Sequence, residues 1–299
     1  MVLQLPPRNF QLGRDLESVV VGHGESYYVS SMPDIQDLHA HLNTLGRVVL
    51  GYSGGVDSAV LAVAGTQALG PERFLAVVGR SASYPENQSD TALRLAREFN
   101  IPLREIETHE LADPRYLSNS TERCYFCKSE LWSRLAELRD RIDFDLVIDG
   151  TNADDLGEHR PGLRASREMG VRSPLAELGW TKAEVREAAR QLELPTWNAP
   201  AAPCLSSRVM YGLTITPARL AQVEQGEAFL RSVGIVGDLR VRHHGNKARI
   251  EVQPDQMGQV REHWADIERT FRHLGFTVAE LDPRGYRRGG LLALAQSPD

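Results

Sequence analysis

Cysteine is scarce in this sequence, with only three among 299 residues. That number is odd and too small for a disulfide scaffold, so it is typical of a reducing compartment and predicts a cytoplasmic protein. Long apolar runs are missing too. No stretch approaches the roughly 18 to 20 apolar residues of a membrane helix. The first twenty residues lack the basic head and apolar run of a secretory signal peptide. We therefore expect neither a membrane-spanning helix nor a signal peptide.

Basic residues are also outnumbered, with 34 Lys and Arg against 40 Asp and Glu, a net charge of −6. This balance argues against a protein whose main function is to bind nucleic acid, whereas the binding of small anionic substrates requires only a few local arginines. The remaining composition, 41% hydrophobic and 25% charged, is that of an ordinary globular protein. At about 150 residues per domain, the length predicts about two domains.

Residues 34–193 alternate between helical and strand patterns. The expected strands cover 47–52, 73–79, 103–108 and 145–149, and the expected helices cover 34–45, 59–69, 86–99 and 128–140. Thr181 and Glu184 form a capping box, which predicts the start of a further helix. Strands that are apolar rather than alternating indicate a parallel sheet covered on both faces, so we expect an α/β, doubly wound fold.

The pattern changes after residues 194–207, which are rich in proline and small residues and predict a domain boundary. We expect an N-terminal extension over 1–33, a first domain over 34–200 and a second over 201–299. The second domain has a smaller α+β pattern: a helix over 217–232, a hairpin of 239–243 with 248–252, a helix over 255–274 and a strand over 276–282.

The string SGGVDS lies between an expected strand and an expected helix, and all six of its residues are candidates for ATP binding: Ser53, Gly54, Gly55, Val56, Asp57 and Ser58. The two glycines let the backbone approach an oxyanion, and the helix that follows directs free N–H groups and its dipole at the same point. The hydroxyls add donors. These features predict a pyrophosphate cradle, which lacks the lysine of the G-x-x-x-x-G-K-[ST] loop.

Polar residues also follow two other strands at their carboxyl ends, where open parallel sheets bind ligands. Gly150 and Thr151 follow strand 145–149, and Ser81 follows strand 73–79, so we expect all three to contact ATP. Asp154 and Asp155 could hold Mg²⁺ between the ATP phosphates, because this hard cation takes oxygen ligands. A helix cap or a solvated pair would explain the two carboxylates equally well.

The three cysteines are candidate metal ligands. Cys124 and Cys127 are three residues apart, a spacing that lets two thiolates bind one metal, and Cys204 lies in the predicted boundary. A redox pair or buried thiols without a task are alternatives. A structural zinc needs a fourth ligand, such as His109 or His159. Three thiolates would leave one iron of a cubane cluster with an open site.

Arg240 and Arg242 lie two apart on an expected strand, so their side chains leave the same face. Two guanidiniums on one face make a phosphate clamp, and Arg208, four residues after Cys204, is a candidate third member. The alternative is the solvated side of a sheet.

SGGVDS is the signature of the PP-loop ATP pyrophosphatases, which cleave ATP between the α and β phosphates and adenylate a substrate oxygen. Within that superfamily the chain resembles the LarE-type ATP-dependent sulfur transferases of nickel-pincer cofactor biosynthesis. The matching stretches are RCYFCK (123–128), DGTNADD (149–155), HRPGLRA (159–165), SPLAELGWTKAEVR (173–186), PCLSSR (203–208), RVRHHGNKARIEV (240–252) and LDPRGYRRGG (281–290).

The resemblance implies a PP-loop (HUP-like) fold, ATP and Mg²⁺ as cofactors, and a pyridinium biscarboxylate mononucleotide whose carboxylate becomes a thiocarboxylate. It makes Cys204 catalytic and Arg208, Arg240 and Arg242 substrate ligands. One family variant sacrifices the sulfur of a single cysteine at the Cys204 position and is left with dehydroalanine. The three-cysteine variant, which this chain matches, implies a 4Fe-4S cluster on Cys124, Cys127 and Cys204, with the Cys204 route still open. The family's hexamers imply a homo-oligomer.

Three other functions compete with this interpretation. A tRNA-thiolating PP-loop enzyme also uses a CxxC pair and a third cysteine, but the acidic balance and the absence of a long basic stripe count against it. Amide-forming relatives that use ammonia would not need Cys204. A nucleotide-sensing protein whose metal only holds two lobes together would bind ATP without releasing pyrophosphate.

Overall fold

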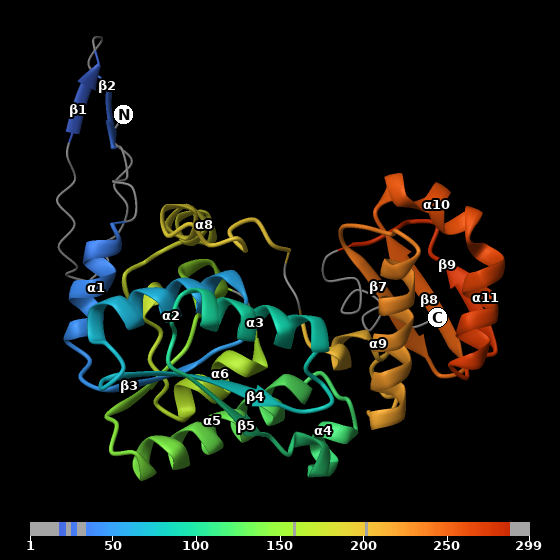
Figure 1. The fold of residues 1–299 in the computed structure, drawn as a ribbon, viewed down its shortest axis with the longest axis horizontal. Coiled ribbons are helices and arrows are strands. Elements are labelled where there is room, and N and C mark those ends of the chain that lie inside the picture. The colour runs from blue at the N-terminus through green and yellow to red at the C-terminus, as the bar shows by residue number, and fades with distance from the viewer. Residues whose placement is uncertain (1–17, 22–24, 29–33, 158–159, 201–202, 288–299) are drawn as a thin grey trace.

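The chain folds into two lobes that lie side by side, the N-terminal one on the left of Figure 1 and the C-terminal one on the right. The structure is a computed structural model and describes residues 18–21, 25–28, 34–157, 160–200 and 203–287. Within the expected N-terminal extension, β1 (Ser18–Val21) pairs antiparallel with β2 (Glu25–Tyr28), and the rest of that extension lies outside the described residues. No described helix is long and apolar enough to cross a membrane.

A four-stranded parallel sheet forms the centre of the N-terminal lobe, with strand order β5-β4-β3-β6. The strands are β3 (Val48–Gly51), β4 (Phe74–Arg80), β5 (Leu103–Glu107) and β6 (Leu146–Ile148). All four expected strands and the parallel α/β fold are thereby confirmed. The chain adds β4 and β5 on one side of β3 and returns to add β6 on the other, so the order reverses between β3 and β6. Open α/β sheets bind ligands at such a switch point.

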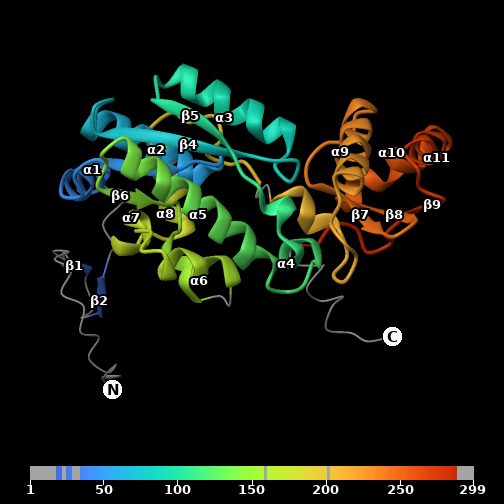
Figure 2. The ribbon, with the colours of Figure 1, turned by 90° about the horizontal axis from the view of Figure 1, so that it is seen from below.

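Helices cover both faces of this sheet, and Figure 2 shows α5 and α6 together on one of them. One core holds side chains from α1 (Ile35–Asn43), α2 (Val56–Leu69), α3 (Glu86–Glu98) and α8 (Lys182–Gln191). A second core on the opposite face holds side chains from α5 (Arg123–Arg141) and α6 (Pro161–Glu168). The apolar strand patterns follow from this double coverage.

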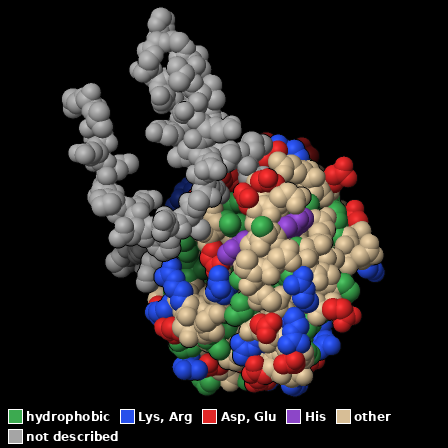
Figure 3. All heavy atoms as spheres, turned by 90° about the vertical axis from the view of Figure 1, so that its left-hand side faces the viewer, with side chains coloured by type: hydrophobic (Ala, Val, Ile, Leu, Met, Phe, Trp, Pro, Cys, Tyr) green, Lys and Arg blue, Asp and Glu red, His purple; other side chains and the backbone are tan. Residues whose placement is uncertain are grey.

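The outer face of the N-terminal lobe mixes charges of both signs. In Figure 3, blue Lys and Arg side chains alternate with red Asp and Glu side chains, and no continuous basic stripe crosses the part of this face that is coloured.

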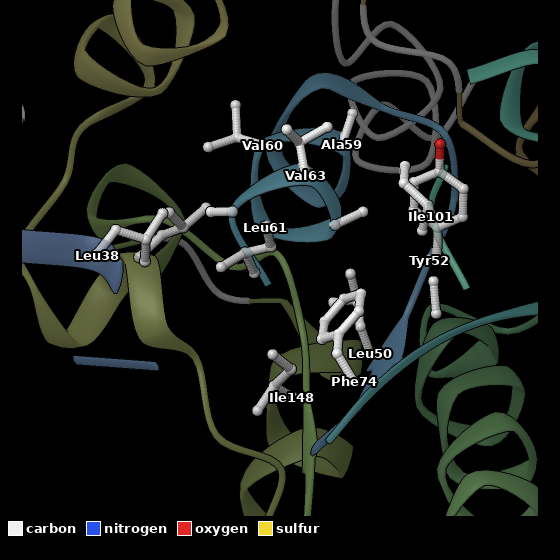
Figure 4. Packing of buried hydrophobic residues seen from close by; sticks show 14 of the residues in the cluster. Leu38, Leu50, Tyr52, Ala59, Val60, Leu61, Val63, Phe74, Ile101 and Ile148 are labelled. Atoms are coloured by element: carbon white, nitrogen blue, oxygen red, sulfur yellow. The ribbon is translucent and has the colours of Figure 1, made fainter. Parts of the chain in front are cut away.

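Helix α2 carries the core of the lobe and begins directly at the glycine-rich string. Its side chains Val60, Leu61 and Val63 are fully or almost fully buried, and Figure 4 shows Leu61 between Leu38 of α1 and Phe74 of β4, with Val60 and Val63 above it in the view. A helix that is apolar on all sides is stable only when it is covered on all sides. The start of α2 is therefore held rigidly against the end of β3.

The C-terminal lobe holds a three-stranded sheet of order β7-β8-β9. The expected hairpin is confirmed as β7 (Leu239–His244) and β8 (Lys247–Val252), and β9 (Val278–Leu281) pairs parallel to β8. Helix α9 (Pro217–Ser232) begins after its Thr216 cap, as expected. The single helix expected over 255–274 is wrong: it is divided into α10 (Met257–Glu262) and α11 (Trp264–His273), because His263 leaves helical backbone angles between them.

Two differences in the N-terminal lobe bear on the site. Helix α5 starts at Arg123, five residues before the expected start, so Cys124 and Cys127 lie in its first turns. Short helical elements also occupy segments that the sequence pattern leaves as loops: η1 (Glu110–Ala112), α4 (Pro114–Leu117), η2 (Ala153–Gly157), α7 (Pro174–Glu177) and η3 (Leu205–Arg208).

The segment after the expected boundary packs against α4. Tyr116 of α4 and Leu205, Val209 and Ile215 share a small buried core. The Asn119 side chain donates to the carbonyl oxygens of Met210 at 2.7 Å and Leu213 at 3.0 Å. A domain division at residue 200 stays a prediction, because this core joins segments from both sides of it.

The capping box of α8 is formed as expected, with the Thr181 hydroxyl and the Glu184 carboxylate each accepting from the other's backbone N–H. We expect Thr181→Ala to lower the free energy of unfolding by about 1 kcal/mol, measured by urea denaturation, because one N–H loses its cap. Thr91→Ala within α3, where the hydroxyl bonds only to the Asn87 carbonyl, is the control and should cause no comparable loss. Equal losses in the two variants would contradict the capping role.

Candidate active site

The glycine string forms a tight turn between β3 and α2. Gly54 has a φ of 70°, and a Cβ at this position would lie 2.8 Å from the Cβ of Ala92, so only glycine fits. The Ser58 hydroxyl closes the turn by donating to the Gly55 carbonyl at 3.0 Å and accepting from Ser53 N–H at 3.2 Å. No described side chain caps the start of α2. Its first N–H groups are thus available for an anion.

The loop after β6 lies directly against this turn. A Cβ on Gly150 would lie 2.9 Å from the backbone nitrogen of Ser58 and 3.2 Å from the carbonyl carbon of Asp57. Thr151 is buried, and its N–H donates to the Asp149 carboxylate at 3.0 Å. The structure therefore brings the two expected parts of the ATP site together at the switch point.

Asp57 has two side-chain partners: Asn152, which directly follows the expected ATP ligands Gly150 and Thr151, and Lys182, which the sequence patterns do not single out as a site residue. Asn152 donates to its Oδ1 at 3.0 Å, and Lys182, the first residue of α8, forms an ion pair with its Oδ2. Lys182 places a cation beside a loop that carries none of its own. The capping box at Thr181 was the available signal, since it locates the residue at a helix start.

Asp154 and Asp155 flank the same loop but already have partners. Asp154 accepts from the backbone N–H of Lys182 at 2.9 Å, and Asp155 pairs with Arg160 at 2.6 Å. Within the described ranges, no three His, Cys, Asp or Glu side chains are arranged to hold a metal ion. A magnesium site at these carboxylates stays a prediction.

Ser81 follows β4 at the same edge of the sheet and donates to the buried carboxylate of Glu110 at 2.5 Å. Glu110 is a second residue that sequence reasoning missed, since nothing local marks it. A cavity of about 410 Å³ lies beside Ser81 at the ends of β4 and β5, lined by Arg80, Ser81, Glu107, Thr108 and His109.

The cysteines come from two elements that face one region. Cys124 is exposed and Cys127 half-buried on α5, whereas Cys204 is half-buried just before η3. Burial raises the pKa of the Cys127 thiol, and the nearby Cys204 and Glu110 raise it further. Of the two histidines considered as fourth ligands, His109 lies at the start of η1, and His159 lies outside the described residues.

Arg123, next to Cys124, ties the two cysteine segments together. Its guanidinium is buried and donates to the Ser206 carbonyl at 2.8 Å and to Asn119 Oδ1 at 2.7 Å. The Sγ atom of Cys124 lies 4.0 Å from the same guanidinium. The start of α5 is therefore anchored to the segment that carries Cys204.

Arg208, Arg240 and Arg242 are buried, so the arginine face of the hairpin is not the solvated side of a sheet. Arg208 pairs with Glu227 at 2.9 Å and donates to the Cys204 carbonyl at 2.9 Å. Arg242 pairs with Glu251 and donates to the Ser207 carbonyl, each at 2.9 Å. Arg240 lies 5.1 Å from the Tyr286 ring centre, and its pKa is lowered by burial and by Arg208.

Comparison with known proteins places this arrangement in a family. Residues 35–135 match the model of the NAD synthase family. The chain is 34% identical over 252 residues to the pyridinium-3,5-bisthiocarboxylic acid mononucleotide synthase of Lactiplantibacillus plantarum, covering 84% of this chain and 91% of that protein. The chain belongs to the LarE-type ATP-dependent sulfur transferases. The expected family, fold and enzyme class are confirmed.

Two further relatives of this sulfur transferase were found. An uncharacterized protein of Synechocystis sp. is 40% identical over 259 residues, covering 86% of this chain and 96% of that protein. One chain of the glutamine-hydrolyzing GMP synthase of Thermococcus kodakarensis is 24% identical over 253 residues, covering 71% of this chain and 80% of that protein.

The contact between the two loops yields a steric test. We expect Gly150→Ala to weaken ATP binding about tenfold, because an added methyl pushes the Ser58 backbone away, and overpacking of this kind costs about 1–3 kcal/mol. Gly157→Ala is the matched control, since no described heavy atom lies within 4 Å of its added Cβ. Isothermal titration with ATP measures both variants, and equal affinities would contradict a nucleotide site at this loop.

Proposed function

We propose that the enzyme adenylates a carboxylate of a pyridinium biscarboxylate mononucleotide and converts it to a thiocarboxylate, in nickel-pincer nucleotide biosynthesis. The name of the Lactiplantibacillus relative supports this substrate class. The observation that carries the proposal is that the turn between β4 and α3 is hydrogen-bonded both to the glycine-rich loop and to the segment that carries Cys204. Tyr84 donates to the Ser53 carbonyl at 2.9 Å, and the Ser83 carbonyl accepts from Leu205 N–H, next to Cys204, at 2.8 Å.

In the first step, a carboxylate oxygen of the substrate attacks the α-phosphorus of ATP. The bond to the bridging oxygen breaks, pyrophosphate leaves, and an acyl-adenylate remains. The Ser53–Ser58 turn would hold the pyrophosphate through N–H groups and hydroxyls, and Lys182 would add positive charge. Ser81, Gly150 and Thr151 would line the rest of the ATP site. Asp154 and Asp155 would hold Mg²⁺, an oxygen-seeking ion that would neutralise phosphate charge.

In the second step, a sulfur nucleophile attacks the acyl carbon, and AMP leaves with its electron pair. In the Cys204 route, the Sγ thiolate would form a thioester with the acyl group. The Cα proton of residue 204 would then be lost to solvent as the Cβ–Sγ bond breaks, which would leave dehydroalanine in the protein and the thiocarboxylate, with the bonding pair on its sulfur, on the substrate. In this proposal residues 34–200 form the nucleotide domain and residues 201–299 the sulfur-transfer domain.

The sulfur source that the three-cysteine pattern favours is a 4Fe-4S cluster on Cys124, Cys127 and Cys204. The donors suit it, because all three are thiols facing one region and thiolates are the ligands of such clusters. A bound cluster would supply an exchangeable sulfide at its open iron. Since no described trio of ligands is arranged to hold a metal ion, loading would require the Cys204 segment to approach α5.

The buried arginines would bind the substrate phosphate and fix its ring beside Cys204. Arg240 and Arg242 leave the same face of β7, and Arg208 holds the Cys204 carbonyl. Guanidiniums bind phosphate through two parallel N–H bonds, and such a clamp supplies the positional part of catalysis.

Replacing the sulfur donor should separate the two steps. We expect Cys204→Ala to retain substrate-dependent exchange of labelled pyrophosphate into ATP within about threefold, because the adenylation groups remain. Mass spectrometry should detect no thiocarboxylate product. Ser58→Ala is the converse control and should lower the exchange about tenfold or more, since its hydroxyl closes the turn. Thiocarboxylate formation by Cys204→Ala at the wild-type yield would contradict the proposal.

Metal analysis distinguishes the two sulfur sources. We expect anaerobic reconstitution with iron and sulfide to give a brown protein with about four irons per chain. Cys127→Ser should lower the iron content sharply, because serine replaces one thiolate ligand. A colourless protein that takes up a single zinc would contradict the cluster, and an intact mass lower by one H₂S would identify Cys204 itself as the donor.

A further inference from the structure

Glu110 is a buried carboxylate that the proposed chemistry does not use. Its side chain is 2% exposed. Oε1 accepts hydrogen bonds from the hydroxyls of Ser81 at 2.5 Å and Ser83 at 2.7 Å. Oε2 is buried and has no hydrogen-bond partner among the described residues. A buried carboxylate with an unsatisfied oxygen costs free energy, so stability alone does not explain it.

The two serines lie in the turn that joins β4 to α3, and this turn touches both halves of the site. Toward the nucleotide loop, Tyr84 and Gln88 each donate to the Ser53 carbonyl at 2.9 Å. Toward the Cys204 segment, the Ser83 carbonyl accepts from the Leu205 N–H at 2.8 Å.

The start of α3, which directly follows this turn, also contacts the C-terminal lobe. The N–H of Glu86, the first residue of α3, donates to Glu224 of α9 at 2.7 Å. The turn is thus hydrogen-bonded to the loop after β3 and to the Cys204 segment, and the helix that follows it is bonded to α9. Within the part of the chain that the structure describes, the hydroxyls of Ser81 and Ser83 both donate to one carboxylate, that of Glu110.

We infer that Glu110 is a positioning residue whose carboxylate fixes the Ser81–Ser83 turn and thereby holds the Cys204 segment against the nucleotide loop. When Ser83 is fixed, its carbonyl oxygen stays in place to accept from the Leu205 N–H, and Cys204 is kept beside the site of adenylation. The contacts described above support the positioning of the Cys204 segment by Glu110, and its consequence for sulfur transfer rests on the proposed function.

Hydrogen exchange tests the placement without any assay of activity. In the full-length protein as purified, we expect Glu110→Ala to speed amide exchange in peptides covering 203–209 about tenfold, because the turn loses its acceptor. Peptides of α11 should be unchanged. Glu110→Gln keeps an acceptor oxygen for both hydroxyls and should exchange within about twofold of the wild type.

Two further variants complete the design. Ser83→Ala removes one hydroxyl and leaves Glu110 in place, so it should speed exchange at 203–209 even where Glu110→Ala does not fold. Glu98→Ala removes an exposed carboxylate from the end of α3, where it pairs only with Arg94, and should change nothing. If Glu110→Ala or Ser83→Ala exchanges at 203–209 like the wild type, the inference is wrong.

The functional consequence is read from the yield of thiocarboxylate per pyrophosphate released. We expect Glu110→Ala to lower this yield about fivefold or more with the ATP affinity unchanged, and Glu110→Gln to restore it. A wild-type yield in Glu110→Ala would overturn the role in transfer. A wild type that makes no thiocarboxylate would refute the proposed function and leave the exchange result to decide the placement.

Discussion

The site depends on a close approach of two backbone loops at the point where the strand order reverses. Gly150 leaves no room for a side chain between the loop after β6 and the nitrogen of Ser58. Because the loops touch there, Asn152 reaches Asp57, and the start of α8 brings Lys182 to the same carboxylate. Polar groups from three segments are thereby assembled around one turn. The all-round burial of α2 keeps that turn from shifting.

The Cys204 segment is positioned by a different kind of interaction, buried polar bonds. Arg208 holds its carbonyl, Arg242 holds that of Ser207, and Arg123 holds that of Ser206. Because each guanidinium is buried, loss of one of these bonds would leave a buried N–H group unpaired, so each bond restrains the backbone. The arginines of the hairpin thus have a structural part in the placement of Cys204 besides the substrate contact proposed for them.

Local patterns predicted much of the fold because they act over a few residues. The strand before SGGVDS, the α8 capping box and the Thr216–Pro217 helix start were all found where the pattern set them. The start of α5 was missed because no side chain caps it: Glu122 holds the cap position without a side-chain hydrogen bond. Glu110 and Lys182 were missed as site residues because their partners lie far away in the chain.

Short strings of residues were enough to predict the PP-loop family, the tight turn before α2 and the set of three thiols, because the chemistry of each string is local. Which of these groups meet was settled by the packing of the folded chain. It paired Asp57 with Lys182 and gave Arg208 and Arg242 carboxylate partners. It also connected Ser53 and Leu205 through one turn, in which Tyr84 bonds to Ser53 and Ser83 bonds to Leu205. The reason is physical: buried charges and backbone groups take whichever partners the packing of α2, α5 and β7 brings within reach, and separation along the chain has no part in that choice.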